Sequence, residues 1–199
     1  MGRCVYNIAI NSLGYGQEFI VKGFLENNKN SMAGYDGYPP IIADDFTYEF
    51  CSDDVFVCSI GDVLTKTRVI ESYVKRGAKF MSLIHNRALI GTNVVIGEGS
   101  IIDEGVHIDP DVTIGKNCLI QAQAIIGHDS IIGDNVRIDS QSFLVGGTIV
   151  KNSATIYTKA MINHNVTIGD NAVVGACSFV IKNVKPGVSV FGVPAKPIF

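Results

Sequence analysis

Tryptophan is absent from this chain of 199 residues, and charged side chains make up only 18% of it. The 16 basic residues are outnumbered by 19 acidic ones, which leaves a net charge of −3 and no basic excess to attract nucleic acid. No apolar run approaches the about 20 residues of a membrane-spanning helix, and the N-terminus lacks the charged-then-apolar order of a signal peptide. These absences predict a cytoplasmic protein without nucleic-acid or membrane partners.

Paired cysteine spacing is also missing. The five cysteines are scattered, and Cys118 falls on an interior position of the repeat described below. A disulfide framework or a cysteine-based metal site would need regular spacings, so neither is predicted and a reducing compartment is expected. The 47% of hydrophobic residues nonetheless indicates a well-buried globular chain.

What the chain has in abundance is an aliphatic residue at every sixth position, without a break over sixteen hexads. Four residues after each aliphatic comes a small or β-branched residue, from Val94 to Val184. The residue directly after the aliphatic is usually Gly, Asp or Asn, as in Gly133-Asp134-Asn135. The aliphatic series is Ile90, Ile96, Ile102, Ile108, Ile114, Ile120, Ile126, Ile132, Ile138, Leu144, Val150, Ile156, Ile162, Ile168, Val174 and Val180.

A period of six fits neither an amphipathic helix nor an alternating strand, and it predicts a parallel β-helix shaped as a three-sided prism. Three hexads, one for each side of the prism, make one coil. The aliphatic residue and the small fifth-position residue both point inward, and Gly, Asn and Asp stand where the backbone turns and a positive φ is useful. The chain is therefore expected to be mainly β.

Residues 1–86 lack this period and predict a small α/β domain that precedes a β-helix domain over residues 87–199. Strand patterns cover residues 18–25, 54–60 and 80–84, and a helix pattern covers residues 64–76, ended by Gly77. Val5, Ile8, Ala9 and Leu13 are expected to form one face of a further short helix, which Gly14-Tyr15-Gly16 would end. The strand–helix–strand order predicts a small parallel sheet.

Three motifs carry a resemblance to a known family: Gly23–Asn27 (GFLEN) after a strand, Ile126–Asp129 (IGHD) followed by Ile132–Asp134 (IGD), and the closing Gly192–Lys196 (GVPAK). The chain resembles the bacterial sugar O- and N-acetyltransferases related to sialic acid O-acetyltransferase and UDP-4-amino-sugar N-acetyltransferase. The resemblance implies a left-handed β-helix preceded by a Rossmann-like domain, and a homotrimer with active sites between neighbouring β-helices. It implies acetyl-CoA as acyl donor and a sugar or sugar nucleotide of surface-polysaccharide synthesis as acceptor.

The resemblance also implies roles for particular residues. His128 would be the catalytic base and Asp129, in place of the usual Glu, the acid that assists it. Gly146 stands one coil after His128, beside it if coils lie about 4.8 Å apart, and its N–H would hold the thioester oxygen. Acetyl-CoA contacts are implied for Arg137, Thr158 and Ala176, the last two being one coil apart. Glu26 and Asn27 match the pair that contacts the sugar nucleotide.

The opening Met1-Gly2-Arg3-Cys4 resembles the last part of the glycine-rich turn with which family members begin. The first strand and most of that turn are therefore expected to be absent, which leaves the small sheet incomplete.

Two other functions remain open at this stage. His164 lies two coils after His128, as ligand histidines do in γ-class carbonic anhydrases, but about 9.6 Å is too far for one Zn²⁺ within one chain. No metal site is therefore assigned. The second alternative is a non-catalytic structural β-helix trimer, which the shortened N-terminus favours and an intact His128 and Gly146 disfavour.

Overall fold

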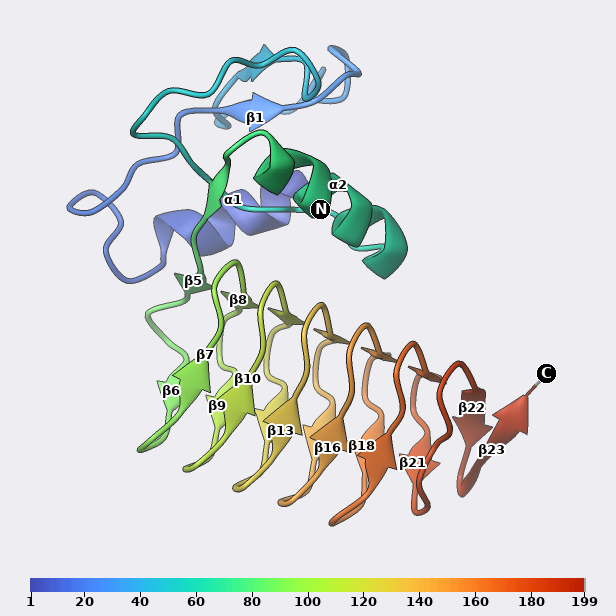
Figure 1. Ribbon diagram of the computed structural model, residues 1–199. Coiled ribbons are helices and arrows are strands. Elements are labelled where there is room, and N and C mark those ends of the chain that lie inside the picture. Colours follow the sequence, from blue (N-terminus) through green and yellow to red (C-terminus); the bar gives the residue numbers. More distant parts are fainter. Residues whose placement is uncertain (199) are drawn as a thin grey trace.

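The computed structural model describes residues 1–198, and over this range the chain is built of short strands and two helices. Neither helix is long and apolar enough to cross a membrane. The mainly β architecture predicted from the hexads is confirmed (Figure 1). The elements before the repeat are α1 (Gly2–Ile10), β1 (Phe24–Leu25), β2 (Ile41–Ala43), β3 (Val55–Phe56), α2 (Val63–Lys75) and β4 (Lys79–Phe80).

Three parallel sheets form the faces of the β-helix. The six-stranded sheet contains β6 (Leu89–Ile90), β9 (His107–Ile108), β12 (Ile125–Ile126), β15 (Phe143–Leu144), β18 (Met161–Ile162) and β21 (Phe179–Val180). The five-stranded sheet contains β7 (Val95–Ile96), β10 (Thr113–Ile114), β13 (Ile131–Ile132), β16 (Ile149–Val150) and β19 (Thr167–Ile168). The eight-stranded sheet contains β5 (Leu83–Ile84), β8 (Ile101–Ile102), β11 (Leu119–Ile120), β14 (Arg137–Ile138), β17 (Thr155–Ile156), β20 (Val173–Val174), β22 (Ser189–Gly192) and β23 (Ala195–Ile198).

The register between coils is three hexads, as predicted. Ile114, for example, pairs with Ile96 in the preceding coil and with Ile132 in the following one. The aliphatic residues from Ile102 to Val180 are at most 2% exposed, and fifth-position residues such as Val136 and Ala160 are buried beside them. The prism interior is therefore a continuous column of aliphatic side chains.

Two different turn positions meet two different requirements, a positive φ and a close approach between coils, which the sequence pattern did not separate. The positive φ falls on the fourth residue of the hexad, such as Asn135 with φ 58°, and not on the glycine after the aliphatic. That glycine is needed because of close approach between coils. A Cβ on Gly97 would lie 2.5 Å from the carbonyl carbon of Gly115 in the next coil, where no side chain fits.

The residues before the repeat confirm the predicted strand–helix–strand unit, because β3 and β4 pair in parallel and α2 connects them. The Asp62 side chain caps α2 by accepting a hydrogen bond from Thr65 N at 2.8 Å. The predicted strand over residues 18–25 is wrong in length, since only Phe24 and Leu25 are strand. The predicted strand over residues 80–84 is two strands, and the second of these, β5, joins the β-helix. The predicted division into residues 1–86 and 87–199 stays a prediction.

The helices lie over one face of the prism, that of the eight-stranded sheet (Figure 1). Val5 and Ile8 of α1 pack in one apolar cluster with Leu83, Ile101 and Leu119 from the sheet. On α2, the buried Lys66 donates a hydrogen bond from Nζ to the Asn117 carbonyl oxygen at 2.7 Å. The prism edge opposite this covered face, between the six- and five-stranded sheets, therefore points away from the helices.

The C-terminal segment closes the β-helix with a hairpin. β22 continues the eight-stranded sheet in parallel beside β20, and β23 then pairs with β22 in the antiparallel direction. The predicted irregular cap is thus partly regular, since β23 adds an outer strand that carries Lys196 and Pro197.

A leucine at an interior fifth position tests the packing of the column. Ala160→Leu adds volume where the residue is 1% exposed, so it should lower the free energy of unfolding by about 1–3 kcal/mol. Met161→Leu is the control, because the neighbouring Met161 side chain points outward and is 41% exposed. Thermal unfolding of the two variants and the wild type measures the difference in stability. Equal melting temperatures would show that the interior at residue 160 accommodates a leucine side chain.

Candidate active site

The edge between the six- and five-stranded sheets carries the third hexad residues Thr92, Pro110, His128, Gly146, His164 and Lys182, and we call it the His128 edge. Backbone hydrogen bonds hold these corners in line. Gly147 N donates to the His128 carbonyl oxygen at 2.8 Å, and Asp129 N donates to that of Pro110 at 3.3 Å. This ladder places each corner residue over the corner residue of the coil before it.

His128 is paired with its neighbour Asp129. The distance from His128 Nδ1 to Asp129 Oδ2 is 2.7 Å, and the two side chains are 59% and 68% exposed. The hydrogen bond to Asp129 raises the pKa of His128 above its ordinary value, and the charges of Asp129 and Asp109 act in the same direction. Because Asp129 accepts the Nδ1 proton, Nε2 of the neutral ring carries the free lone pair.

Gly146 lies directly against the His128 ring, as the spacing of one coil predicted. A Cβ on Gly146 would stand 2.6 Å from His128 Nε2 and 2.8 Å from Cε1. Any side chain at this position would displace the ring from the edge, so the arrangement depends on glycine. The basic nitrogen and the Gly146 backbone are thereby brought together at one point on the surface.

The Gly146 N–H is left without an acceptor among residues 1–198. On the edge between the five- and eight-stranded sheets the same hexad position is capped by the following coil. Lys116 N donates to Asp134 Oδ1 at 2.7 Å, and Asp134 N donates to Asn152 Oδ1 at 2.9 Å. The coil after Gly146 offers His164 instead of a carboxylate or amide. Gly146 is buried, and a buried residue with an unpaired N–H is unusual, so an acceptor oxygen from a ligand would satisfy this donor.

Thr158 and Ala176 stack as predicted, but on the neighbouring edge. Cys177 N donates to the Thr158 carbonyl oxygen at 3.0 Å, which sets Ala176 one coil after Thr158. The six-stranded sheet separates this edge from the His128 edge, and its outward side chains include the partly exposed Phe143 and Met161. A ligand in contact with both edges must therefore cross this apolar face.

Arg137 is not brought to His128. It extends from β14 on the eight-stranded sheet and forms a two-point ion pair with Asp139, Nε to Oδ1 at 2.6 Å and one terminal nitrogen to Oδ2 at 3.0 Å. Its other terminal nitrogen donates to the Gly61 carbonyl oxygen at 3.0 Å, in the segment between β3 and α2. In this chain the guanidinium links the segment between β3 and α2 to the β-helix. The implied acetyl-CoA contact stays a prediction.

Glu26 and Asn27 follow β1 at its carboxyl end, where open α/β sheets place their ligands. Glu26 Oε1 accepts a hydrogen bond from Asn28 N at 3.1 Å, and Asn27 is exposed. The strand that they follow, β1, lies with the helices on the side of the eight-stranded sheet (Figure 1), whereas the His128 edge joins the other two sheets. One chain alone does not bring them to His128.

One pair near the site was missed by sequence reasoning. His107 Nε2 lies 3.2 Å from Asp109 Oδ1, in the coil before His128. The signal was present as a His-x-Asp sequence, in which residues two apart in a strand share a face. No cluster of three or more His, Cys, Asp or Glu side chains suited to a metal ion occurs within residues 1–198.

Comparison with known proteins agrees with this description. Residues 111–146 and 147–182 match the family described as bacterial transferase hexapeptide, six repeats. A search of curated proteins found no match. The predicted likeness to sugar acetyltransferases of the hexapeptide type is confirmed among solved structures, whose common feature is the β-helix fold.

Three of these structures cover most of the chain. The acetyltransferase domain of PglB from Neisseria gonorrhoeae, in complex with acetyl coenzyme A, has a TM-score of 0.89 and 23% identity, over 99% of this chain and 94% of that one. PerB from Caulobacter crescentus, in complex with CoA and GDP-perosamine, has a TM-score of 0.78 and 28% identity, over 81% and 80%. WeeI from Acinetobacter baumannii has a TM-score of 0.81 and 24% identity, over 88% and 85%.

The pairing of His128 with Asp129 predicts a titration that NMR can follow. The pKa of His128 should lie above the about 6.5 of an unperturbed histidine, because the carboxylate stabilises the imidazolium. Asp129→Asn should lower the pKa of His128 toward that value, so that the neutral imidazole becomes the main form at a lower pH. His164, which is followed by Asn165, is the reference within the same spectrum. An unchanged His128 pKa in the variant would refute the pairing.

Proposed function

We propose that this protein is an acetyl-CoA-dependent acetyltransferase that acts on a sugar or a nucleotide-linked amino sugar in surface-polysaccharide or glycan biosynthesis. The observation that carries the proposal is the unpaired Gly146 N–H held against His128 Nε2, with Asp129 behind the ring. A free lone pair beside a free backbone donor is what acyl transfer from a thioester needs. PerB and PglB, which bind CoA and acetyl-CoA, support this choice of donor.

His128 acts as the general base. Its Nε2 takes a proton from the acceptor amine or hydroxyl as that group attacks the thioester carbon. The tetrahedral intermediate then breaks its carbon–sulfur bond, and the leaving CoA sulfur takes up the proton from His128 and departs as the free thiol. Asp129 holds the ring in the tautomer with the proton on Nδ1, and it stabilises the imidazolium that results. Since a raised pKa leaves more of His128 protonated near neutrality, the base form and the activity rise with pH through that pKa.

Gly146 acts on the other reacting group. Its N–H donates a hydrogen bond to the thioester oxygen, where negative charge develops during the attack, and it needs no rearrangement because it has no other acceptor within residues 1–198. The pantetheine arm of the donor lies along the stack of Thr158 and Ala176, and Arg137 contacts the donor at a greater distance from the thioester. The stacked Thr158 and Ala176 and the unpaired Gly146 N–H fit a ligand of this kind.

The acceptor is held by Glu26 and Asn27 of the small domain. Because these residues follow β1, on the side of the eight-stranded sheet, we propose a homotrimer in which the small domain of one subunit faces the His128 edge of another. The partly exposed apolar side chains Phe143, Met161 and Ile131 on the two sheets beside that edge fit burial between subunits. The protein works in the cytoplasm, where acetyl-CoA is made.

Removal of the base tests the chemistry. His128→Ala should lower turnover of an amino sugar by about 10²–10⁴-fold, while acetyl-CoA binding measured by calorimetry stays close to that of the wild type. His164→Ala is the control, since it removes a histidine from the same edge that has no acid beside it. Near wild-type turnover in His128→Ala would exclude the assigned base.

A side chain in place of Gly146 tests whether the Gly146 N–H is part of the acetyl-CoA site. Gly146→Leu should weaken acetyl-CoA binding at least tenfold, because the new side chain occupies the space of the His128 ring and the thioester. Thr92→Leu is the matched control, at the same hexad position of the same edge but two coils before His128. If both variants bound acetyl-CoA equally well, the acetyl-CoA site would have to lie elsewhere. If the wild type did not bind acetyl-CoA at millimolar concentration, a structural β-helix would be favoured.

A further inference from the structure

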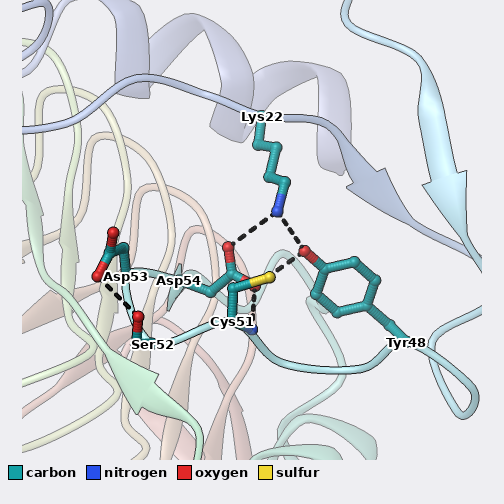
Figure 2. A network of polar contacts seen from close by, with 6 residues as sticks. All are labelled: Lys22, Tyr48, Cys51, Ser52, Asp53 and Asp54. Carbon is teal, nitrogen blue, oxygen red and sulfur yellow. Dashed lines mark hydrogen bonds and ion pairs between the residues drawn. The ribbon is translucent and has the colours of Figure 1, made fainter.

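Ser130 is a buried polar residue whose side chain has no hydrogen-bond partner. Within residues 1–198 three buried side-chain oxygens lack one, and these are Asp45 Oδ1, Ser130 Oγ and Asn135 Oδ1. The Lys22 side chain, by contrast, bonds to both Tyr48 and Asp54 although it is more than half exposed (Figure 2). Ser130 directly follows the pair of His128 and Asp129 and is fully buried. An unpaired hydroxyl therefore stands in the prism interior behind the proposed base, and such an exception needs an explanation.

The interior positions behind the His128 edge carry a hydroxyl group at only two corners, those of His128 and Gly146. The fifth hexad residues of this edge are Val94, Val112, Ser130, Thr148, Val166 and Val184. Ser130 and Thr148 are both fully buried. Because valine has nearly the shape of threonine and fills this position at the other four corners, packing does not require a hydroxyl here, and burial of a polar group costs free energy. The two hydroxyls thus coincide with the candidate site.

Thr148 donates to the peptide group that carries the free N–H of Gly146. Its Oγ1 hydroxyl bonds to the Val145 carbonyl oxygen at 2.5 Å, three residues earlier at the same corner. Among the described residues no backbone N–H donates to this oxygen. The Val145 C=O and the Gly146 N–H belong to one trans peptide group, so they point in opposite directions. A hydroxyl that holds the carbonyl toward the prism interior therefore holds the N–H away from it.

The peptide group between Gly115 and Lys116, on another edge, shows the same arrangement with both ends bonded. The buried Ser100 Oγ donates to the Gly115 carbonyl oxygen at 2.9 Å. At the other end of that peptide group, Lys116 N donates to Asp134 Oδ1 at 2.7 Å. An interior hydroxyl and an anionic surface oxygen thus hold one peptide group between them. The peptide group of Gly146 has the interior hydroxyl, and its N–H is directed as one that bonds to an anionic oxygen.

We propose that Thr148 is a positioning residue for acyl transfer, whose hydroxyl orients the Val145–Gly146 peptide group and polarises the Gly146 N–H toward the thioester oxygen. A donor at the carbonyl draws electron density from the amide nitrogen, so hydrogen bonds at the two ends of one peptide group strengthen each other. The effect is largest when the thioester oxygen becomes an oxyanion, so Thr148 stabilises the transition state more than bound acetyl-CoA. The inference rests on the proposed function in naming the thioester oxygen as the acceptor.

Ser130 offers the same carbonyl a second interior hydroxyl. The equivalent Ser142 Oγ donates to the Tyr157 carbonyl oxygen, fifteen residues later, at 3.0 Å. The residue fifteen positions after Ser130 is Val145, whose oxygen already accepts from Thr148. This explains why the Ser130 hydroxyl is unpaired. It also means that Ser130 can take the place of Thr148, so a test must remove both hydroxyls.

Turnover of an amino sugar is compared in a Ser130→Ala background with threonine, valine or serine at residue 148. Thr148→Val should lower kcat about five- to thirtyfold, less than the loss of an entire oxyanion donor, because the Gly146 N–H remains and is only weaker. The KM for acetyl-CoA should change less than twofold. Thr148→Ser should keep most of the turnover. A packing role would give the reverse order, since valine keeps the shape of threonine and serine does not. A kcat of the valine form within twofold of the threonine form would overturn the inference.

The NMR resonance of the Gly146 amide nitrogen tests the inference without catalysis. In the same background Thr148→Val should move this resonance upfield, because the Val145 carbonyl loses its donor, and Thr148→Ser should restore it. Ser100→Ala is the control, since it removes a buried hydroxyl from another edge and should leave both the resonance and kcat unchanged. An unmoved resonance in Thr148→Val would overturn the inference. If the wild type shows no transferase activity, the proposed function fails, and this resonance still decides whether Thr148 polarises the Gly146 N–H.

Discussion

Everything in the β-helix depends on one hydrogen-bonding constraint, which is that each strand pairs in parallel with the strand three hexads earlier and with the strand three hexads later. The constraint puts aliphatic over aliphatic in the interior and corner over corner on the surface. A residue inserted within a strand would shift the residues after it by one position and turn the interior side chain of that strand outward. The uninterrupted hexads from Ile90 to Val180 are the sequence requirement of that ladder.

The candidate site follows from the same ladder. His128 and Gly146 meet because they are one coil apart, and the donor of Gly146 stays free because the next coil offers no oxygen to accept it. The corner at Lys116 and Asp134 shows the alternative, in which a side chain of the following coil caps the N–H. The candidate site therefore lies on an edge where such caps are absent, at the coil where glycine lets the backbone meet the His128 ring.

The sequence was sufficient for the β-helix and for the contact of His128 with Gly146, because both depend on spacing alone. It was insufficient for Arg137, whose ion pair with Asp139 and bond to Gly61 O join segments far apart in the chain. It also assigned the positive φ to the turn as a whole, because a preference for Gly, Asn or Asp does not distinguish conformational freedom from close approach. The strands before the repeat form two separate two-stranded sheets, β1 with β2 and β3 with β4, which agrees with the incomplete sheet expected from the sequence.

The terminal hairpin affects whether another chain can continue the β-helix at its C-terminal end. A stack of identical parallel coils resembles a short length of fibre, since the last coil offers backbone groups on which another chain can continue. β23 runs against this direction, and its outer edge carries Lys196 and Pro197, a charge and a residue without an N–H. On the eight-stranded face the hairpin ends the parallel ladder, so this face offers no parallel edge on which a further coil could continue.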